Sequence, residues 1–139
     1  MNKKIIQNKE IIKGGGVIFR EGVTEKEILL IKTSTRGFSF PKGHLEENET
    51  IKECALRECQ EETGLELKII KKLPDLFFTK IDTGEHFIDN YYLMEVIGGK
   101  LTKENLGDEL KWIPLSKVKD AFIFKNRRDY IERNKGLIE

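Results

Sequence analysis

Apolar positions along the chain fall into short runs separated by glycine, proline and charged residues. Residues 14–20 (GGGVIFR) and 28–32 (ILLIK) predict two strands joined by a polar turn. The segment around Pro41 and Gly43 predicts a short extended piece, since proline disfavours helix at the residue before it. Further apolar runs predict later strands at 65–73, 75–81, 86–97 and 108–115.

The one long helix in the middle of the chain is marked at both ends. Thr50 and Glu53 have the spacing of a capping box, and Gly64 is placed to end the helix in a left-handed conformation. These signals predict a helix from Ile51 to Thr63. Ser116 is predicted to cap a second helix, and residues 126–137 predict a polar helix near the C-terminus.

Strands interrupted by one central helix and followed by C-terminal helices predict an α/β or α+β sandwich. The chain has 139 residues and no internal repeat or linker, so we expect a single domain over residues 1–139.

Composition narrows the class of protein. There are 25 basic and 24 acidic residues, and a net charge of +1 argues against a stable nucleic-acid partner. We expect no membrane partner, because no apolar run approaches the ~20 residues that span a bilayer. The two cysteines, Cys54 and Cys59, project in different directions from a helix and fit a reducing compartment. With no signal-peptide pattern at the start, we expect a cytoplasmic protein.

Three acids lie on an unexpected part of the central helix. At about 100° per residue, Glu58, Glu61 and Glu62 share an arc of about 100° with the inward-facing apolar positions. A solvated charged face, with Arg57 paired to Glu61, is the simpler reading. However, like charges at these spacings repel, and unpaired burial of carboxylates costs several kcal/mol each.

A divalent cation would neutralise these acids. The candidate ligands are hard oxygens, which favour Mg²⁺, with Mn²⁺ as the alternative. Mg²⁺ is commonly shared between carboxylates and substrate phosphates, so the helix indicates a phosphate-containing substrate.

Residues 43–65 resemble the signature of the Nudix hydrolases, in which glycine, glutamate, Arg-Glu, a Glu-Glu pair and glycine recur at fixed spacing. The matching positions are Gly43, Glu49, Arg57, Glu58, Cys59, Glu61, Glu62, Gly64 and Leu65. The one departure is Cys59, where the family usually has Leu, Val or Ile, and a small apolar thiol can fill the same packing role.

The resemblance implies an α/β/α sandwich around a mixed sheet, with a catalytic loop-helix-loop and a C-terminal helix. It implies that Glu58, Glu61 and Glu62 bind metal, and that one of them activates water. Arg57 would pair with Glu49 and orient the helix. The backbone carbonyl of Lys42 would be a further metal ligand.

A last acid in the family comes from a later loop, for which Glu109 or Asp108 is the candidate by position. For substrate phosphates, the side chains of Lys42 and Arg36 are the expected binding groups.

The resemblance extends to one branch of the family. The run FPKGHLE resembles the diadenosine tetraphosphate hydrolases, so His44 is a candidate phosphate contact. In the same branch an aromatic residue stacks on a nucleobase, and either Tyr91 or Tyr92 would take this role, since alternation lets only one face a cleft. The basic residues of the last helix are interpreted as its solvated side; these are Lys125, Arg127, Arg128 and Arg133.

The leading hypothesis is a Mg²⁺-dependent pyrophosphohydrolase of nucleoside diphosphate-linked compounds, with dinucleoside tetraphosphate first. The alternatives are a MutT-type enzyme that sanitises oxidised nucleoside triphosphates, an RNA 5′ pyrophosphohydrolase, and a non-catalytic nucleotide sensor. We expect a monomer or homodimer whose partner is a nucleotide polyphosphate substrate.

Overall fold

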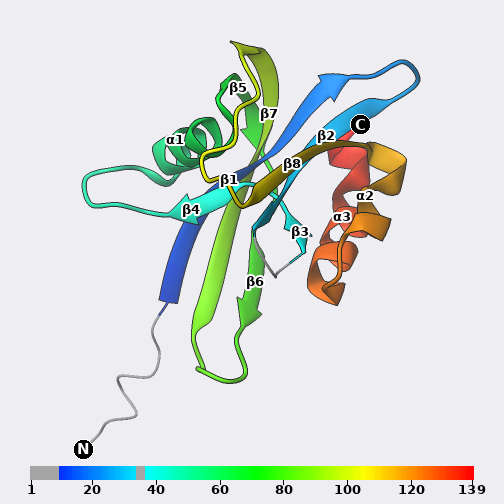
Figure 1. Cartoon of the computed structure of the whole chain (residues 1–139). Coiled ribbons are helices and arrows are strands. Elements are labelled where there is room, and N and C mark those ends of the chain that lie inside the picture. Colours follow the sequence, from blue (N-terminus) through cyan, green and yellow to red (C-terminus); the bar gives the residue numbers. More distant parts are fainter. Residues whose placement is uncertain (1–9, 34–36) are drawn as a thin grey trace, which may run out of the picture.

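The computed structural model describes residues 10–33 and 37–139. Its strands and helices follow one another as shown in Figure 1. The strands are β1 (Glu10–Glu21), β2 (Lys26–Thr33), β3 (Phe38–Ser39), β4 (Lys42–His44), β5 (Leu65–Lys72), β6 (Leu76–Thr79), β7 (His86–Gly99) and β8 (Asp108–Pro114). The helices are α1 (Ile51–Thr63), α2 (Leu115–Ala121) and α3 (Lys125–Ile138).

The strands form one mixed sheet. Its main path is β3-β2-β1-β7-β5, in which the long strands β1 and β7 run parallel and the other pairs are antiparallel. β1 pairs with β4 through residues 13–15 and with β2 through residues 18–21. This division of β1 places β4, and the loop leading to α1, beside the middle of the sheet.

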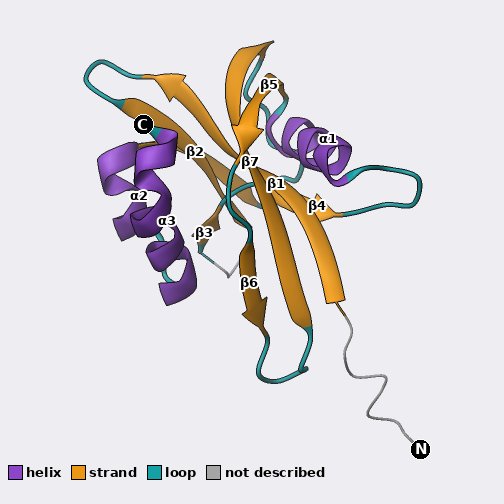
Figure 2. Cartoon of the chain, turned by 180° about the vertical axis from the view of Figure 1, so that it is seen from behind, coloured by secondary structure: helices purple, strands orange, loops and turns teal. Residues whose placement is uncertain are grey.

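Helices cover both faces of the sheet (Figures 1 and 2). One face packs with α2 and α3 around a core that includes Phe40, Tyr91 and Tyr130. The other face packs with α1 around a smaller core that includes Cys59 and Met94. The predicted α/β/α sandwich with a mixed sheet is therefore confirmed. Among the described residues, no helix is long and apolar enough to cross a membrane.

Helix α1 has the predicted bounds because both of its ends are capped. The N–H of Glu53 donates to the Thr50 hydroxyl at 3.0 Å, and the N–H of Thr50 donates to the Glu53 carboxylate at 2.8 Å. Gly64 ends the helix with φ 76°, and its N–H donates to the Gln60 carbonyl. These bonds satisfy backbone groups that a helix leaves free at its ends.

Helix α1 lies very close to β1, and glycine allows this approach. A Cβ atom on Gly14 would lie 2.7 Å from the backbone nitrogen of Ala55 and 3.0 Å from the Cys54 sulfur. The buried Cys54 and Ala55 therefore pack directly on the strand backbone. The position of the acidic helix relative to the sheet depends on the absence of a side chain here.

The start of α2 differs from the prediction. The helix begins at Leu115 with Pro114 as its N-cap, so Ser116 is not the capping residue. Pro114 ends β8 in an extended conformation, so the chain enters the helix two residues earlier than predicted. The Ser116 N–H and hydroxyl instead donate to the Glu25 carboxylate at 2.7 and 2.8 Å.

Replacement of Gly14 by alanine tests the close packing of α1. We expect Gly14→Ala to lower the free energy of unfolding by about 1–3 kcal/mol, because the added methyl group must push the helix off the strand. Urea unfolding followed by circular dichroism measures this change.

Gly136→Ala is the matched control. It lies in α3 with open space around the added methyl group, and should raise stability by about 0.5–1 kcal/mol through helix propensity. Equal effects of the two substitutions would contradict the packing argument.

Candidate active site

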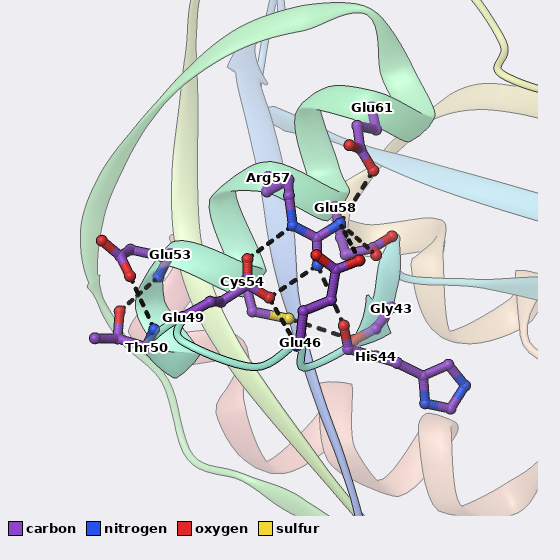
Figure 3. Close-up of polar contacts among 10 residues, drawn as sticks. All are labelled: Gly43, His44, Glu46, Glu49, Thr50, Glu53, Cys54, Arg57, Glu58 and Glu61. Atoms are coloured by element: carbon purple, nitrogen blue, oxygen red, sulfur yellow. Dashed lines mark hydrogen bonds and ion pairs between the residues drawn. The ribbon is translucent and has the colours of Figure 1, made fainter.

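Arg57 is the centre of the polar network on α1 (Figure 3). Its Nε and Nη2 atoms donate to the two carboxylate oxygens of Glu49 at 2.8 and 2.9 Å. Nη2 also donates to the His44 carbonyl at 3.2 Å. The guanidinium thus connects α1 to the loop before it, and the predicted pairing of Arg57 with Glu49 is present.

The same guanidinium contacts two of the three predicted metal-binding acids. Its Nη1 atom donates to Glu58 at 2.9 Å and to Glu61 at 3.2 Å. Glu58 is half-buried, whereas 48% of the Glu61 side chain is exposed. Glu61 therefore lies at the edge of the face shared with the apolar residues, and Arg57 balances part of the repulsion between these acids.

The charge of Arg57 changes the proton affinity of its bidentate partner. Hydrogen bonds from Arg57, and then from the N–H of Glu46, lower the pKa of Glu49 to about 2. The hydrogen bonds that Arg57 donates to Glu49 raise the pKa of Arg57 above its ordinary value. The pair is ionised at any pH at which the protein would work, so the link between loop and helix persists.

Gly43 brings the strand β4 against the acids. A Cβ atom at Gly43 would collide with the carboxylate of Glu58, so no other residue leaves space for that side chain. On the inner side of the same strand, the Cys54 thiol lies 3.6 Å from the Gly43 carbonyl. The acids and β4 therefore form one closely packed unit.

The backbone of Lys42 faces the acids. Gly16 N–H donates to the Pro41 carbonyl, and because bonding direction alternates along an antiparallel strand, the N–H and C=O of Lys42 point away from β1. No described strand pairs with that edge of β4. The Lys42 backbone on this edge lowers the pKa of Glu62, against the larger effect of burial. The Lys42 carbonyl, predicted as a metal ligand, lies on the same open edge.

Glu62 is the acid with the strongest perturbation. Burial, followed by the nearby charge of Glu58, raises the pKa of Glu62 to about 8. A half-buried carboxylate in this state is stabilised by a cation that replaces its proton.

The residues present fit a hard divalent cation. The possible donors are carboxylate and carbonyl oxygens, which Mg²⁺ and Mn²⁺ prefer. Within residues 10–33 and 37–139, no three side chains are already gathered at coordination distance. Arg57 holds Glu58 and Glu61 instead, so the acids would exchange some of these bonds for a metal.

The acid from the later loop has several candidates. Asp108 is buried and accepts a hydrogen bond from Asn105, whereas Glu109 is exposed on β8 opposite Lys32. The charge of Glu104 is among the causes that raise the pKa of Glu62, which makes Glu104 a third candidate for this acid. Sequence reasoning did not include Glu104 because it considered only the acids next to the following strand. A role of Glu109 in metal binding stays a prediction.

A cavity of about 1010 Å³ opens beside this unit, on the α3 side of the sheet. Its lining includes cations from three elements, Lys13, Lys42 and Arg127, and the predicted phosphate contact His44. A smaller hollow shares these three cations and is also lined by Glu62. The hollow beside Glu62 and the cavity therefore adjoin each other, with these three cations in both linings.

The side chain of Lys42 is almost enclosed in this wall. It is 11% exposed, and its ammonium lies 3.9 Å from the carboxylate of Asp89, which is 1% exposed. Burial lowers the pKa of Lys42 to about 8, although the charge of Asp89 acts in the opposite direction. An added anion would stabilise the charged form of Lys42, and its role in phosphate binding stays a prediction.

The tyrosines do not occupy the predicted position. Tyr91 is 0% exposed and lies in the core against Phe40 and Tyr130, so its ring offers no face to a nucleobase. Tyr92 packs on the opposite face of the sheet, in the core beside α1. The rings that line the cavity are Phe78, Phe87 and Phe124. Alternation along β7 places Phe87 on the face of Tyr91, a signal that sequence reasoning did not use.

Two predictions about basic residues have different outcomes. Arg36 lies outside the described residues. Arg127 was interpreted as part of a solvated face, but it lines both the cavity and the smaller hollow, and its Nη1 atom is buried. The helical pattern of α3 could not show this, since its first turn packs over the cavity.

The family model of the NUDIX domain matches residues 14–133. The chain belongs to the Nudix hydrolase family. Over 147 residues it is 31% identical to the ADP-ribose pyrophosphatase of Methanocaldococcus jannaschii, an alignment that covers 97% of this chain and 87% of that protein. Over 105 residues it is 31% identical to the MutT4 protein of Mycobacterium tuberculosis, which covers 73% of this chain but only 42% of that relative.

Solved structures show the same Nudix fold. The Ap4A hydrolase of C. elegans superposes with a TM-score of 0.76 at 20% identity, covering 93% of this chain and 98% of that one. This agreement confirms the predicted architecture. The predicted class, a hydrolase of phosphorus-containing anhydrides, is supported at the level of the family.

The raised pKa of Glu62 predicts how stability depends on pH without metal. The folded protein holds the Glu62 proton up to a pKa of about 8, compared with 4.5 for an ordinary glutamate. This contribution to stability is complete below the ordinary pKa and is lost as the pH rises toward 8. In EDTA, the melting temperature of Glu62→Gln should therefore fall less than that of the wild type between pH 5 and 8.5.

Magnesium should act in the opposite direction at Glu62. Because metal binding favours the ionised carboxylate, Mg²⁺ should stabilise the wild type more at pH 8 than at pH 5, and Glu62→Gln should lose this difference. If the melting temperatures of the wild type and of Glu62→Gln changed equally with pH in EDTA, the role assigned to Glu62 would be wrong.

Proposed function

We propose that this protein is a Mg²⁺-dependent pyrophosphohydrolase of nucleoside diphosphate-linked compounds. Its partner is then a nucleotide polyphosphate or a related diphosphate. The observation that carries the proposal is that Glu62 and three cations line one hollow, and that the same three cations also line the adjoining cavity. Acids that can hold a metal and cations that can hold phosphate meet at the same place.

Each group in this site has a separate task. Glu58, Glu61, Glu62 and the Lys42 carbonyl would hold Mg²⁺, which supplies charge neutralisation on phosphate oxygens and lowers the pKa of bound water. The Lys42 side chain binds a phosphate oxygen and orients the diphosphate for in-line attack. Arg57 keeps the acids in place through Glu49. The aromatic end of the cavity excludes water and receives the nucleoside.

Two substrates are favoured by particular observations. A dinucleoside tetraphosphate such as diadenosine tetraphosphate is first, supported by the Pro-Lys-Gly-His run at residues 41–44 and the fold shared with an Ap4A hydrolase. ADP-ribose is second, supported by 31% identity over most of the length of an ADP-ribose pyrophosphatase. Both place an adenosine diphosphate unit at the site.

Product analysis separates these substrates from the other hypotheses. The purified protein with Mg²⁺ is given diadenosine tetraphosphate, ADP-ribose, nucleoside triphosphates and 5′-triphosphate RNA, and the products are resolved by chromatography. Asymmetric cleavage of diadenosine tetraphosphate supports the first substrate, and AMP with ribose phosphate supports the second. Pyrophosphate release from nucleoside triphosphates supports the MutT-type alternative instead.

Removal of one acid should abolish most of the activity while the fold remains. We expect Glu58→Gln or Glu61→Gln to reduce kcat/KM at least about 100-fold, since even groups behind the metal ligands typically contribute 10–100-fold. The measurement is the initial rate with Mg²⁺ on the best substrate of the product analysis.

Glu47→Gln is the matched control, because Glu47 is an exposed acid in the loop before α1. It should retain activity within about twofold, as expected for a surface change. Equal rates in the Glu47, Glu58 and Glu61 variants would overturn the proposed role of the acids, and undetectable turnover in the wild type would favour a nucleotide sensor.

A further inference from the structure

Two buried polar atoms beside the cavity lack partners. Nη1 of Arg127 is buried and has no hydrogen-bond partner among the described residues, and the same is true of Oδ1 of Asp89. The Arg127 guanidinium otherwise lies 5.2 Å from the Phe124 ring centre. A buried guanidinium N–H without an acceptor costs the desolvation of a charged donor, so the folded chain leaves a position for an acceptor from outside.

The charges around this position are predominantly positive. Lys13, Lys42 and Arg127 line both the cavity and the smaller hollow, and the charges of Lys13 and Arg127 both disfavour the charge of Lys42. The nearby acids are Asp89, whose carboxylate lies 3.9 Å from the Lys42 ammonium, Glu62 in the hollow, and Asp82 and Glu85 in the cavity wall. The three cations share the lining of the hollow with a single acid, Glu62, and Nη1 of Arg127 has no acceptor among the described residues, so the hollow suits an added anion.

Asp89 is not itself the missing acceptor. Its Oδ2 accepts a hydrogen bond from the Tyr91 hydroxyl at 3.2 Å and lies 3.9 Å from the Lys42 ammonium. No ion pair joins Asp89 to Arg127 in the described structure. Asp89 is therefore the acidic partner of Lys42, whereas Arg127 lines the cavity from α3.

The three cations line both the cavity and the adjoining hollow, and the other residues of the two linings differ. Glu62 lines the hollow at one end. The other end carries aromatic rings, with Phe78 and Phe87 stacked at 4.9 Å between centroids and Phe124 under Arg127. A molecule that follows this order carries a planar ring, then an anionic group, then a group that meets the acids.

We propose that Arg127, together with Lys13 and Lys42, binds the phosphate nearest the nucleoside, so that the bond cleaved lies beyond this phosphate. This assignment rests on the proposed function, because it orders the parts of the same substrate along the site. Arg127 is then a phosphate-binding residue that favours a nucleotide over the bare nucleoside. The guanidinium presents a planar pair of N–H groups, which match phosphate oxygens.

The test measures binding without metal or turnover. In EDTA at pH 7, isothermal titration calorimetry gives the affinities of the wild type for adenosine and for AMP. We expect AMP to bind about tenfold or more tightly than adenosine, the gain of a charge-assisted hydrogen bond in a buried site. In Arg127→Gln this ratio should fall below about threefold, whereas the affinity for adenosine itself should be retained.

Two further variants make the result specific. Arg133→Gln removes an exposed arginine from the same helix and should keep the ratio of the wild type. Arg127→Lys keeps the charge without the planar fork and should give an intermediate ratio, which also serves if Arg127→Gln proves unfolded by circular dichroism. A ratio that is the same in Arg127→Gln and Arg133→Gln, or equal binding of adenosine and AMP by the wild type, would overturn the assignment.

Kinetics with Mg²⁺ separates this inference from the proposed function. If hydrolysis occurs, Arg127→Gln should raise KM about tenfold or more with a smaller change in kcat, because it removes binding shared by ground and transition states. Hydrolysis with an unchanged KM would reject the role of Arg127 and leave the proposed function intact. Metal-free binding that depends on Arg127, with no hydrolysis of any substrate, would reject the proposed function alone.

Discussion

The arrangement of the site depends on one guanidinium that serves four carboxylates. Arg57 binds Glu49 through two hydrogen bonds, reaches Glu58 and Glu61 with its remaining nitrogen, and lies 3.9 Å from Glu46. Without it, acids placed one turn apart on α1 would repel each other, and the loop before the helix would lose its attachment. Glu49 is bound through Nε and Nη2, whereas Glu58 and Glu61 are bound through Nη1, so Arg57 could release these two acids to a cation and still hold the loop. The protein is therefore able to fold with its acids close together before any cation arrives.

Close contacts at two glycines connect this acidic network to the sheet. Gly14 lets α1 rest on the backbone of β1, and Gly43 leaves room for the Glu58 carboxylate against β4. On the opposite face, α3 closes the cavity with Arg127 and Phe124. The site thus combines a rigid acidic half, built by local sequence, with a cationic and aromatic half assembled from distant segments. Such a division suits a family that keeps one chemistry and varies the molecule on which it acts.

The two halves also differ in how far they could be predicted. Local signals determined α1, since Thr50, Glu53 and Gly64 satisfy its own backbone groups, and fixed spacing identified Glu58, Glu61 and Glu62. The start of α2 was mispredicted because Glu25, far away in sequence, takes the hydrogen bonds of Ser116. Arg127 and Tyr91 were misplaced for a similar reason: whether a residue faces solvent, core or cavity depends on which element packs over it. Periodicity gives the face of a strand or helix but not the identity of its neighbour.

The two buried thiols have a consequence for the chemical durability of the site. Cys54 and Cys59 lie 3.6 Å from the carbonyls of Gly43 and Pro41, on either side of Lys42, and burial raises the pKa of Cys54 to about 11 and that of Cys59 well above its ordinary value. Peroxides and electrophiles attack the thiolate form, which is scarcely populated here at neutral pH. The segment around β4 therefore packs on two thiols that are unreactive while the domain is folded. Alkylation of Cys54 or Cys59 would thus report that the domain has unfolded.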